Sequence, residues 1–228
     1  MKHLLFSAFF ALSGLVAAQE FTMELAQDLK PRNIGPAGMS GRVTAIDAVR
    51  TNPDIIYAGT ASGGLWKSTS GGTTWHPIFD NELTASIGAV AIDPNNADVI
   101  WVGTGEGNPR NSLNGGYGVY RSLDGGKSWK AMGLEKTRHI HRILIDPSDS
   151  NTVYVGAIGS PWGAHKERGV YKTTDGGKNW KQVLFSNELS GVADMVMDPQ
   201  NPNKLVVALW EHKRDPWFFK SGGSGSGL

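Results

Sequence analysis

The sequence has no cysteine, which excludes disulfide bonds and an acyl-anchored lipoprotein. A chain of 228 residues without disulfides must rely on its hydrophobic core for stability. The chain also lacks an excess of charge of one sign, because its 22 basic and 21 acidic residues nearly cancel. Since no basic tail or stripe is present, the sequence predicts no nucleic-acid partner.

Long apolar runs are absent except at the start of the chain. A short basic start precedes an apolar stretch, Leu4–Leu15, and small residues, Val16–Ala18. This layout predicts a secretory signal peptide over residues 1–18, followed by a lead-in segment over residues 19–40 with a short helical period at Met23–Leu29. No later run approaches 18 apolar residues, so we expect no transmembrane segment after signal removal. The sequence therefore predicts an exported protein, either periplasmic or secreted.

Glycine is abundant, with 30 residues, and 8 tryptophans accompany it. Both recur in a long-period repeat, which is typical of tight turns between β-strands. In each copy a glycine-led segment with an aromatic and a basic residue runs into a Gly-Gly turn and then a tryptophan. The segments are Gly64–Ser68, Gly118–Ser122 and Gly169–Thr173, and the tryptophans are Trp75, Trp129 and Trp180, which are 54 and 51 residues apart.

Two more strands precede each copy: one that ends in aspartate, and a second that is rich in valine, isoleucine and aromatic residues. Each period thus holds four short strands, which predicts an all-β fold, a β-propeller with four-stranded antiparallel blades. A parallel β-solenoid would have shorter coils, and an immunoglobulin-like sandwich would not repeat its turns so regularly. The propeller is predicted over residues 41–228, with blades at about 41–80, 86–134, 139–185 and 191–228.

The fourth predicted blade is incomplete. Gly227 and Leu228 stand in the repeat where Gly169 and Val170 begin a third strand. We therefore expect about three and a half blades of a larger ring, with the rest of the propeller in a missing C-terminal part. The Gly/Ser-rich composition of residues 222–228 also fits a flexible linker, which is the alternative.

A known motif now accounts for the repeat. Ser122–Trp129 matches the Asp box, S-x-D-x-G-x-[ST]-W, at every defined position, while Thr173–Trp180 begins with threonine and the first copy has Ser70 for the aspartate. The chain resembles the Asp-box (BNR) propellers of sialidases, xyloglucanases and sortilin-type receptors. Its segment Asn33–Val43, N-I-G-P-A-G-M-S-G-R-V, is similar to the opening of large secreted bacterial proteins of sortilin-like type. The resemblance runs from residue 30 onward.

The Asp box also has a physical reason of its own. An aspartate can accept hydrogen bonds from backbone N–H groups of its turn, and the glycine pair supplies positive φ. The tryptophan then packs between neighbouring sheets. We therefore predict structural, not catalytic, roles for Ser70, Trp75, Asp124, Trp129, Asp175 and Trp180.

Insertions between second and third strands gather at the end of the blades opposite the Asp boxes. They cover Gly105–Tyr117, Ile158–Arg168 and Glu211–Ser226. Long loops on one face of a rigid scaffold are the usual place for binding. Solvated charge is the alternative for any one residue, since exposed charges are common. The predicted ligand-binding residues are Arg110, Trp162, His165, Arg168, Arg214 and Trp217.

Metal binding is only weakly indicated. His139 and His141 are two apart on a probable strand, so both side chains can share one face. No carboxylate has the spacing of a known site beside them, so we predict no metal and no cofactor.

Two functions fit this face. The first is a module that binds a peptide, a protein or a glycan. The second is a glycoside hydrolase of sialidase- or xyloglucanase-like type, which needs two carboxylates, and the candidates are Glu106, Glu167 and Glu211. Xyloglucanase-type relatives have an acid in a T-D-x-G-G segment, where this chain has Ala61, and the arginine cluster of sialidases is not recognisable. The sequence therefore favours the binding module.

Overall fold

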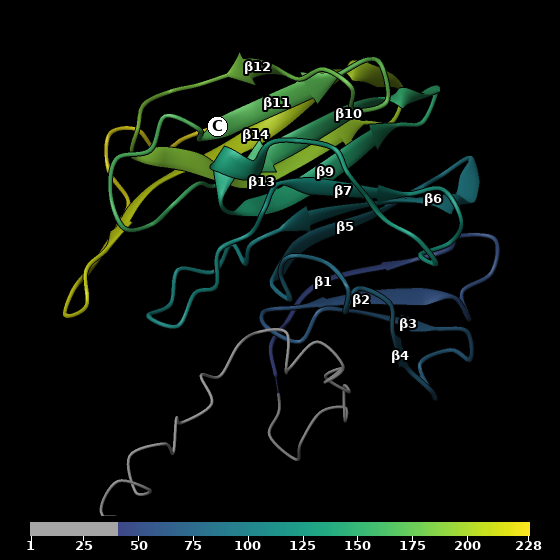
Figure 1. The fold of residues 1–228 in the computed structure, drawn as a ribbon. Helices are drawn as coiled ribbons and strands as arrows, with labels where there is room; N and C mark the ends of the chain where they lie inside the picture. The colour runs from purple at the N-terminus through teal and green to yellow at the C-terminus, as the bar shows by residue number, and fades with distance from the viewer. Residues whose placement is uncertain (1–40) are drawn as a thin grey trace, which may run out of the picture. The chain divides into compact units, whose positions relative to one another are not determined.

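The computed structural model describes residues 41–228, so the predicted signal peptide, the lead-in segment and the helical period at Met23–Leu29 lie outside the described residues. The described residues form four antiparallel sheets, which follow one another in chain order (Figure 1). Three sheets have four strands and the last has three. The predicted all-β propeller with four-stranded antiparallel blades is confirmed.

The strands have the following bounds. Blade one contains β1 (Val43–Ala48), β2 (Ile56–Thr60), β3 (Leu65–Ser68) and β4 (His76–Pro77). Blade two contains β5 (Ile87–Asp93), β6 (Asn96–Thr104), β7 (Val119–Ser122) and β8 (Lys130–Ala131), and a 3₁₀ turn, η2 (Glu135–Thr137), follows it. Blade three contains β9 (Ile140–Asp146), β10 (Asp149–Ala157), β11 (Gly169–Thr173) and β12 (Lys181–Leu184). Blade four contains β13 (Ser190–Asp198), β14 (Asn201–Arg214) and β15 (Phe219–Ser221).

Blade four differs from the expectation in its second-to-third-strand insertion. The predicted loop over residues 211–226 contains a β-hairpin, because β14 continues to Arg214 and pairs with β15. Beyond this hairpin, Gly227 pairs with Leu209 in an isolated bridge. Gly169 pairs with Ala157 in the same way in blade three. Gly227 therefore occupies the register position at which the third strand starts in the other blades.

The hydrophobic core lies between consecutive blades, in three clusters. At each interface the second strand of one blade presents a glycine to a branched side chain in the first strand of the next. A methyl group on any of these glycines would come closer than 3.0 Å to that side chain. Glycine in a strand is needed where another element approaches this closely. The pairs are Gly59 and Ile87, Gly103 and Ile140, and Gly156 and Val192.

The Asp-box turns are closed by side-chain hydrogen bonds. Asp124 Oδ1 accepts bonds from the backbone N–H groups of Lys127 (3.0 Å) and Ser128 (2.9 Å), and Oδ2 accepts one from the Ser128 hydroxyl (2.5 Å). The buried hydroxyl of Ser122 donates to Asp124 Oδ1 (2.7 Å) and accepts a bond from the N–H of Gly126 (2.8 Å). Gly126 has a φ of 89°, in the left-handed region that favours glycine.

The other two Asp boxes make equivalent contacts. Asp175 Oδ1 accepts bonds from the N–H groups of Lys178 and Asn179, both at 3.0 Å. In blade one, Ser70 Oγ replaces the carboxylate and accepts a bond from the N–H of Thr74 (2.9 Å). These contacts are the ones expected of structural side chains.

The Asp-box tryptophans join neighbouring blades. Trp129 Nε1–H donates to the carbonyl of Ile78 (2.7 Å), and Trp180 Nε1–H donates to the carbonyl of Met132 (2.7 Å), each in the preceding blade. In contrast, Trp75 Nε1–H donates to the carbonyl of Gly72 (2.8 Å), which lies within its own turn.

A second contact repeats at the same two interfaces. Lys67 Nζ donates to the carbonyl of Gly125 (2.8 Å), and an Arg121 nitrogen donates to the carbonyl of Gly176 (2.8 Å). The cation in the third strand of one blade therefore binds the Asp-box turn of the next. Blades one to three are linked through backbone carbonyls as well as through apolar packing.

The Asp124→Ala substitution should lower the thermal stability and flatten its dependence on acid pH. The hydrogen bond from the Ser128 hydroxyl is the largest cause that lowers the pKa of Asp124 below its ordinary 3.8. A lowered carboxylate pKa contributes stability above the unfolded pKa, and that stability is lost as pH falls through the folded pKa. Thermal melts between about pH 2 and pH 7 would measure the effect. Parallel Tm-against-pH curves for the variant and the wild type would contradict the assignment.

Candidate functional site

The candidate site is the end of the blades that holds the long insertions, here called the long-loop face. It comprises residues 105–118, residues 158–168 and the β14–β15 hairpin. Hydrogen bonds join the three segments. Arg214 Nε–H donates to Asn111 Oδ1 (2.6 Å), and the Arg214 backbone N–H donates to the carbonyl of Pro161 (2.7 Å). Blades two, three and four therefore contribute to one connected surface.

Glu106 is the most deeply placed of the three candidate catalytic carboxylates. Its side chain has no exposed surface, and both of its oxygens accept bonds from Arg42, at 2.8 Å from Nε and 2.7 Å from a terminal nitrogen. Its backbone N–H donates to the Ser86 hydroxyl (3.0 Å), and His139 Nδ1 lies 2.8 Å from its carbonyl oxygen. Because this side chain is fully buried and both of its oxygens are bonded to Arg42, the carboxylate is not accessible to a substrate.

The other two carboxylates are also engaged. Glu211 accepts bonds from Lys220 Nζ (2.6 Å) and from the N–H of Gly225 (3.0 Å). The lysine bond is the largest cause that lowers the pKa of Glu211. Glu167 Oε2 accepts a bond from the hydroxyl of Tyr171 (3.0 Å). A general acid of a glycosidase needs a raised pKa, so the environment of Glu211 is unsuited to that role.

Arg168 lies inside the loop face and not on it. It is fully buried, and its guanidinium donates to the carbonyls of Ile158 (3.0 Å) and Ser160 (2.6 Å). A terminal nitrogen also lies 3.2 Å from His212 Nδ1. Burial lowers the pKa of Arg168 to about 10 and that of His212 to about 4. The structure therefore differs from the expectation of a ligand-exposed Arg168, because this side chain supports the loop from within.

Three histidines lie at the loops of this face: His165 is part of the loop at residues 158–168, and His139 and His141 lie beside the loop after β6. His165 Nδ1 accepts a bond from the backbone N–H of Ser160 (3.2 Å), and the backbone N–H of His165 donates to the carbonyl of Glu188 (2.8 Å). His139 and His141 both face the loop at residues 106–107, as their spacing predicted. Within residues 41–228, no group of three or more potential ligands is placed to hold a metal ion.

Four predicted ligand-binding side chains remain accessible. Trp217 is 86% exposed and Trp162 is 44% exposed, which is unusual for side chains of this size. Arg110 and Arg214 line a hollow of about 520 Å³, together with Pro109, Asn111 and Ser112. The face thus combines free indoles with guanidinium groups, while its carboxylates are internally paired.

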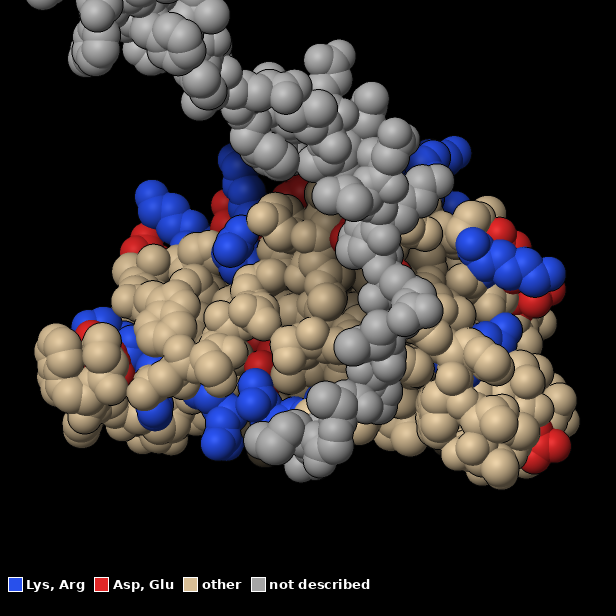
Figure 2. Space-filling model, turned by 60° about the horizontal axis from the view of Figure 1, so that its bottom comes forward, with Lys and Arg blue, Asp and Glu red and all other residues tan. Residues whose placement is uncertain are grey.

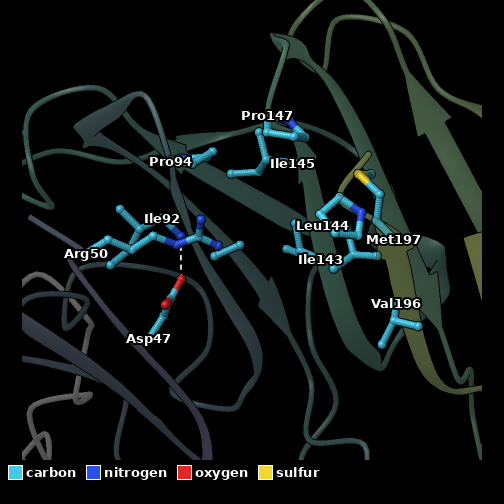
Figure 3. A pocket seen from close by; sticks show the side chains of 12 residues that line it. Asp47, Arg50, Ile92, Pro94, Ile143, Leu144, Ile145, Pro147, Val196 and Met197 are labelled. Atoms are coloured by element: carbon cyan, nitrogen blue, oxygen red, sulfur yellow. Dashed lines mark hydrogen bonds between the residues drawn. The ribbon is translucent and has the colours of Figure 1, made fainter. Parts of the chain in front are cut away.

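A second hollow, of about 550 Å³, lies at the opposite end (Figure 3). The first strands of all four blades contribute to it, and so do the prolines that begin the first turns, Pro94, Pro147 and Pro199. Most of the residues that line it are apolar, with Ile92 and Met197 on opposite sides and Arg50 beside Ile92 (Figure 3). Substitutions in this hollow can therefore serve as controls in tests of the long-loop face.

Charge is mixed over the surface. Figure 2 shows basic and acidic side chains beside one another on the face in view, with wide uncharged areas between them. No large area of one sign is visible there, which agrees with the nearly balanced composition. Any charge preference of a ligand must therefore come from local groups.

Sequence reasoning did not identify three residues of this region: Arg42 and Ser86, which bond to Glu106 from outside the long-loop face, and Phe218 within it. Arg42 holds Glu106, Ser86 binds the Glu106 backbone, and Phe218 is 60% exposed beside Trp217. The only signal for Arg42 was its place in the glycine-rich G-P-A-G-M-S-G-R-V segment.

The four sheets and the three Asp boxes define an Asp-box β-propeller. A family model described as Sortilin-Vps10 (sortilin, neurotensin receptor 3) matches residues 117–221. The predicted resemblance to sortilin-type and xyloglucanase-type propellers is confirmed by this match and by the relatives below. Within residues 41–228, the structure has no helix that is long and apolar enough to cross a membrane.

Curated relatives and solved structures are similar to most of the chain. A xyloglucanase of Hypocrea jecorina is 28% identical over 222 residues, which are 84% of this chain and 25% of that protein. Xyloglucanase Xgh74A of Acetivibrio thermocellus is 28% identical, with the same two coverages. The crystal structure of an ancestral GH74 enzyme has a TM-score of 0.58 at 25% identity, covering 79% of this chain and 25% of that one. The Niastella koreensis GH74 enzyme has a TM-score of 0.56 at 27% identity, with 72% and 25% covered. The chain spans about a quarter of the length of the relatives it matches.

Proposed function

We propose that the protein is an exported binding module whose long-loop face holds a glycan. The observation that supports this function is that the tryptophans of that face are exposed, whereas its candidate carboxylates are buried or hydrogen-bonded. Trp162 and Trp217 are exposed, whereas Glu106 is buried and the carboxylates of Glu167 and Glu211 are bonded to neighbouring side chains. Exposed indoles provide flat contact area at a low cost in conformational entropy, whereas each of the three candidate carboxylates already accepts a hydrogen bond from a neighbouring side chain.

Two further points favour a glycan over a peptide or protein. The matched curated relatives are named xyloglucanases, so their names refer to a glycan. Guanidinium and amide groups also line a hollow on this face, where they can donate to ring oxygens and hydroxyl groups. Peptide or protein binding by the same face is the other outcome that an array experiment would detect.

The Trp217→Ala substitution should weaken glycan binding by about 1–3 kcal/mol, because an exposed aromatic anchor at a hot spot is lost. Trp162→Ala should have a smaller effect, since this side chain is already half covered. Glycan and peptide arrays would identify the ligand, and titration calorimetry would measure the affinities. Arg50→Gln, at the opposite end, is the matched control and should bind like the wild type. A loss of binding in Arg50→Gln alone would place the site in the hollow of Figure 3.

A glycoside hydrolase is the second candidate, favoured by the names of the relatives. In that case Glu106→Gln, Glu167→Gln or Glu211→Gln should abolish turnover of a xyloglucan oligosaccharide while binding survives. The engaged carboxylates and Ala61 argue against this activity in the described residues. Release of reducing sugar by the wild type, and its loss in one of these variants, would reverse our preference.

A further inference from the structure

The hollow between the blade-two loop and the blade-four hairpin has an unbalanced charge. Five residues line it, Pro109, Arg110, Asn111, Ser112 and Arg214, and none of them is acidic. The nearest acid in sequence, Asp215, is engaged by Lys213 Nζ at 3.0 Å. Two guanidinium groups therefore share a hollow that contains no counter-charge.

The two arginines differ in how they are held. Arg214 is fixed by its Nε–H bond to Asn111 Oδ1, and its guanidinium lies over the ring of Phe219, 5.2 Å from the centroid. Asn111 in turn donates from Nδ2 to the carbonyl of Pro216 (3.4 Å). With Nε engaged, the outer nitrogens of Arg214 remain for another acceptor.

Arg110 has no such anchor. Among the described residues its guanidinium makes no hydrogen bond or ion pair, although its backbone N–H donates to the carbonyl of Asn108 (2.8 Å). A guanidinium group matches a carboxylate with two parallel bonds, and this pairing is stronger than that with a neutral hydroxyl. The chemistry of the hollow thus favours an oxyanion such as a carboxylate over a neutral polar group.

The residues near the hollow indicate which kind of molecule should carry that carboxylate. Pro161, which accepts the Arg214 N–H, is followed directly by the half-exposed Trp162, and Pro216, which accepts from Asn111, is followed by the exposed Trp217. Each of these two proline carbonyls therefore belongs to the residue that directly precedes an exposed tryptophan. A sugar ring with a carboxylate can meet an indole with its face and a guanidinium with its acid group.

We propose that this hollow is a subsite for an acidic glycan, specifically one that contains uronic acid residues. The proposal rests on the glycan-binding function proposed above and names the ligand class. The carboxylate of one uronate binds Arg110 and Arg214, and flanking sugar rings lie against Trp162 and Trp217. Because the groups are at the surface, the interaction is weakened by salt.

The test compares a galacturonic acid oligosaccharide with its methyl ester, which keeps the rings and removes the charge. Titration of the full chain should show at least roughly 10-fold tighter binding of the acid form, the scale of a charge-assisted hydrogen bond. Arg110→Gln should remove this preference, and Arg50→Gln, a matched control at the opposite end, should keep it. Circular dichroism would check that each variant is folded.

Each other result has a distinct meaning. Equal affinity for the acid and its ester would overturn the acidic subsite while the proposed glycan binding stands. A preference that survives in Arg110→Gln and also in Arg214→Gln would overturn the assignment to this hollow. Absence of binding to the acid, to the ester and to a neutral xyloglucan oligosaccharide would overturn the proposed function itself.

Discussion

Replacement of Trp101 by alanine is expected to lower the free energy of unfolding by about 3–5 kcal/mol, as for other large-to-small changes in a packed core. Trp101 is fully buried between blades two and three, in edge contact with the ring of Trp180 at 6.1 Å between centroids. It also supports Arg121, whose guanidinium lies 5.3 Å from its ring centroid and binds the carbonyl of Gly176. Denaturant unfolding followed by circular dichroism would measure the change.

Trp101→Tyr is the matched control. Blades one and three have Tyr57 and Tyr154 at the equivalent position, and the Tyr57 hydroxyl donates to the carbonyl of Gly125 (3.2 Å). The indole N–H of Trp101 is buried and has no partner among the described residues, so a tyrosine could gain a bond that the tryptophan lacks. We expect the tyrosine variant to retain most of the stability. A cost equal to that of alanine would show that this interface does not follow the repeat.

Replacement of Arg42 by alanine should destabilise the protein by about 3–5 kcal/mol, because it leaves the carboxylate of Glu106 buried without its ion-pair partner. Arg42 is the only side chain among the described residues that bonds to the carboxylate oxygens of Glu106. This pair joins the start of β1 to the loop after β6, so its loss should also loosen the long-loop face. Chemical denaturation would give the stability, and hydrogen exchange would report on the loop.

Two companion variants separate charge from geometry. Arg42→Lys keeps the charge but cannot make the two-pronged contact, so we expect an intermediate loss. Arg42→Ala combined with Glu106→Gln removes the buried charge and should recover part of the stability. A double variant as unstable as Arg42→Ala would mean that packing, and not the unpaired charge, accounts for the cost.

The fold could be predicted from the sequence because the Asp-box motif repeats. The Gly-Gly turn and the tryptophan of the Asp box recur at blade spacing, so β-propeller blades could be inferred without a structure. The second strands begin at Asn96 and Asp149, before the runs rich in valine and isoleucine that predicted them, because the first turns are only two residues long. Hydrophobic patterning does not detect these strand starts, because residues 96–98 and 149–151 are mostly polar.

The candidate site was less predictable, because it is formed by insertions that interrupt the repeat. The position of the insertions could be predicted from spacing, and so could the exposed Trp217. The burial of Arg168 could not, because its partners are backbone carbonyls, which have no sequence signature. The pairing of Arg42 with Glu106 spans 64 residues and depends on how two blades meet. The β14–β15 hairpin was not predicted, because the glycines and serines that follow it are typical of a loop.

The indole bonds of the Asp boxes offer one proton for each of the first two blade boundaries. The Nε1 proton of Trp129 is held by blade one and that of Trp180 by blade two, whereas that of Trp75 stays within its own hairpin. In an NMR spectrum these protons resonate apart from the backbone amides. The rates at which the protons of Trp129 and Trp180 exchange with deuterium would therefore report separately on the opening of the first and second blade boundaries. The proton of Trp75, whose bond does not cross a boundary, is the reference.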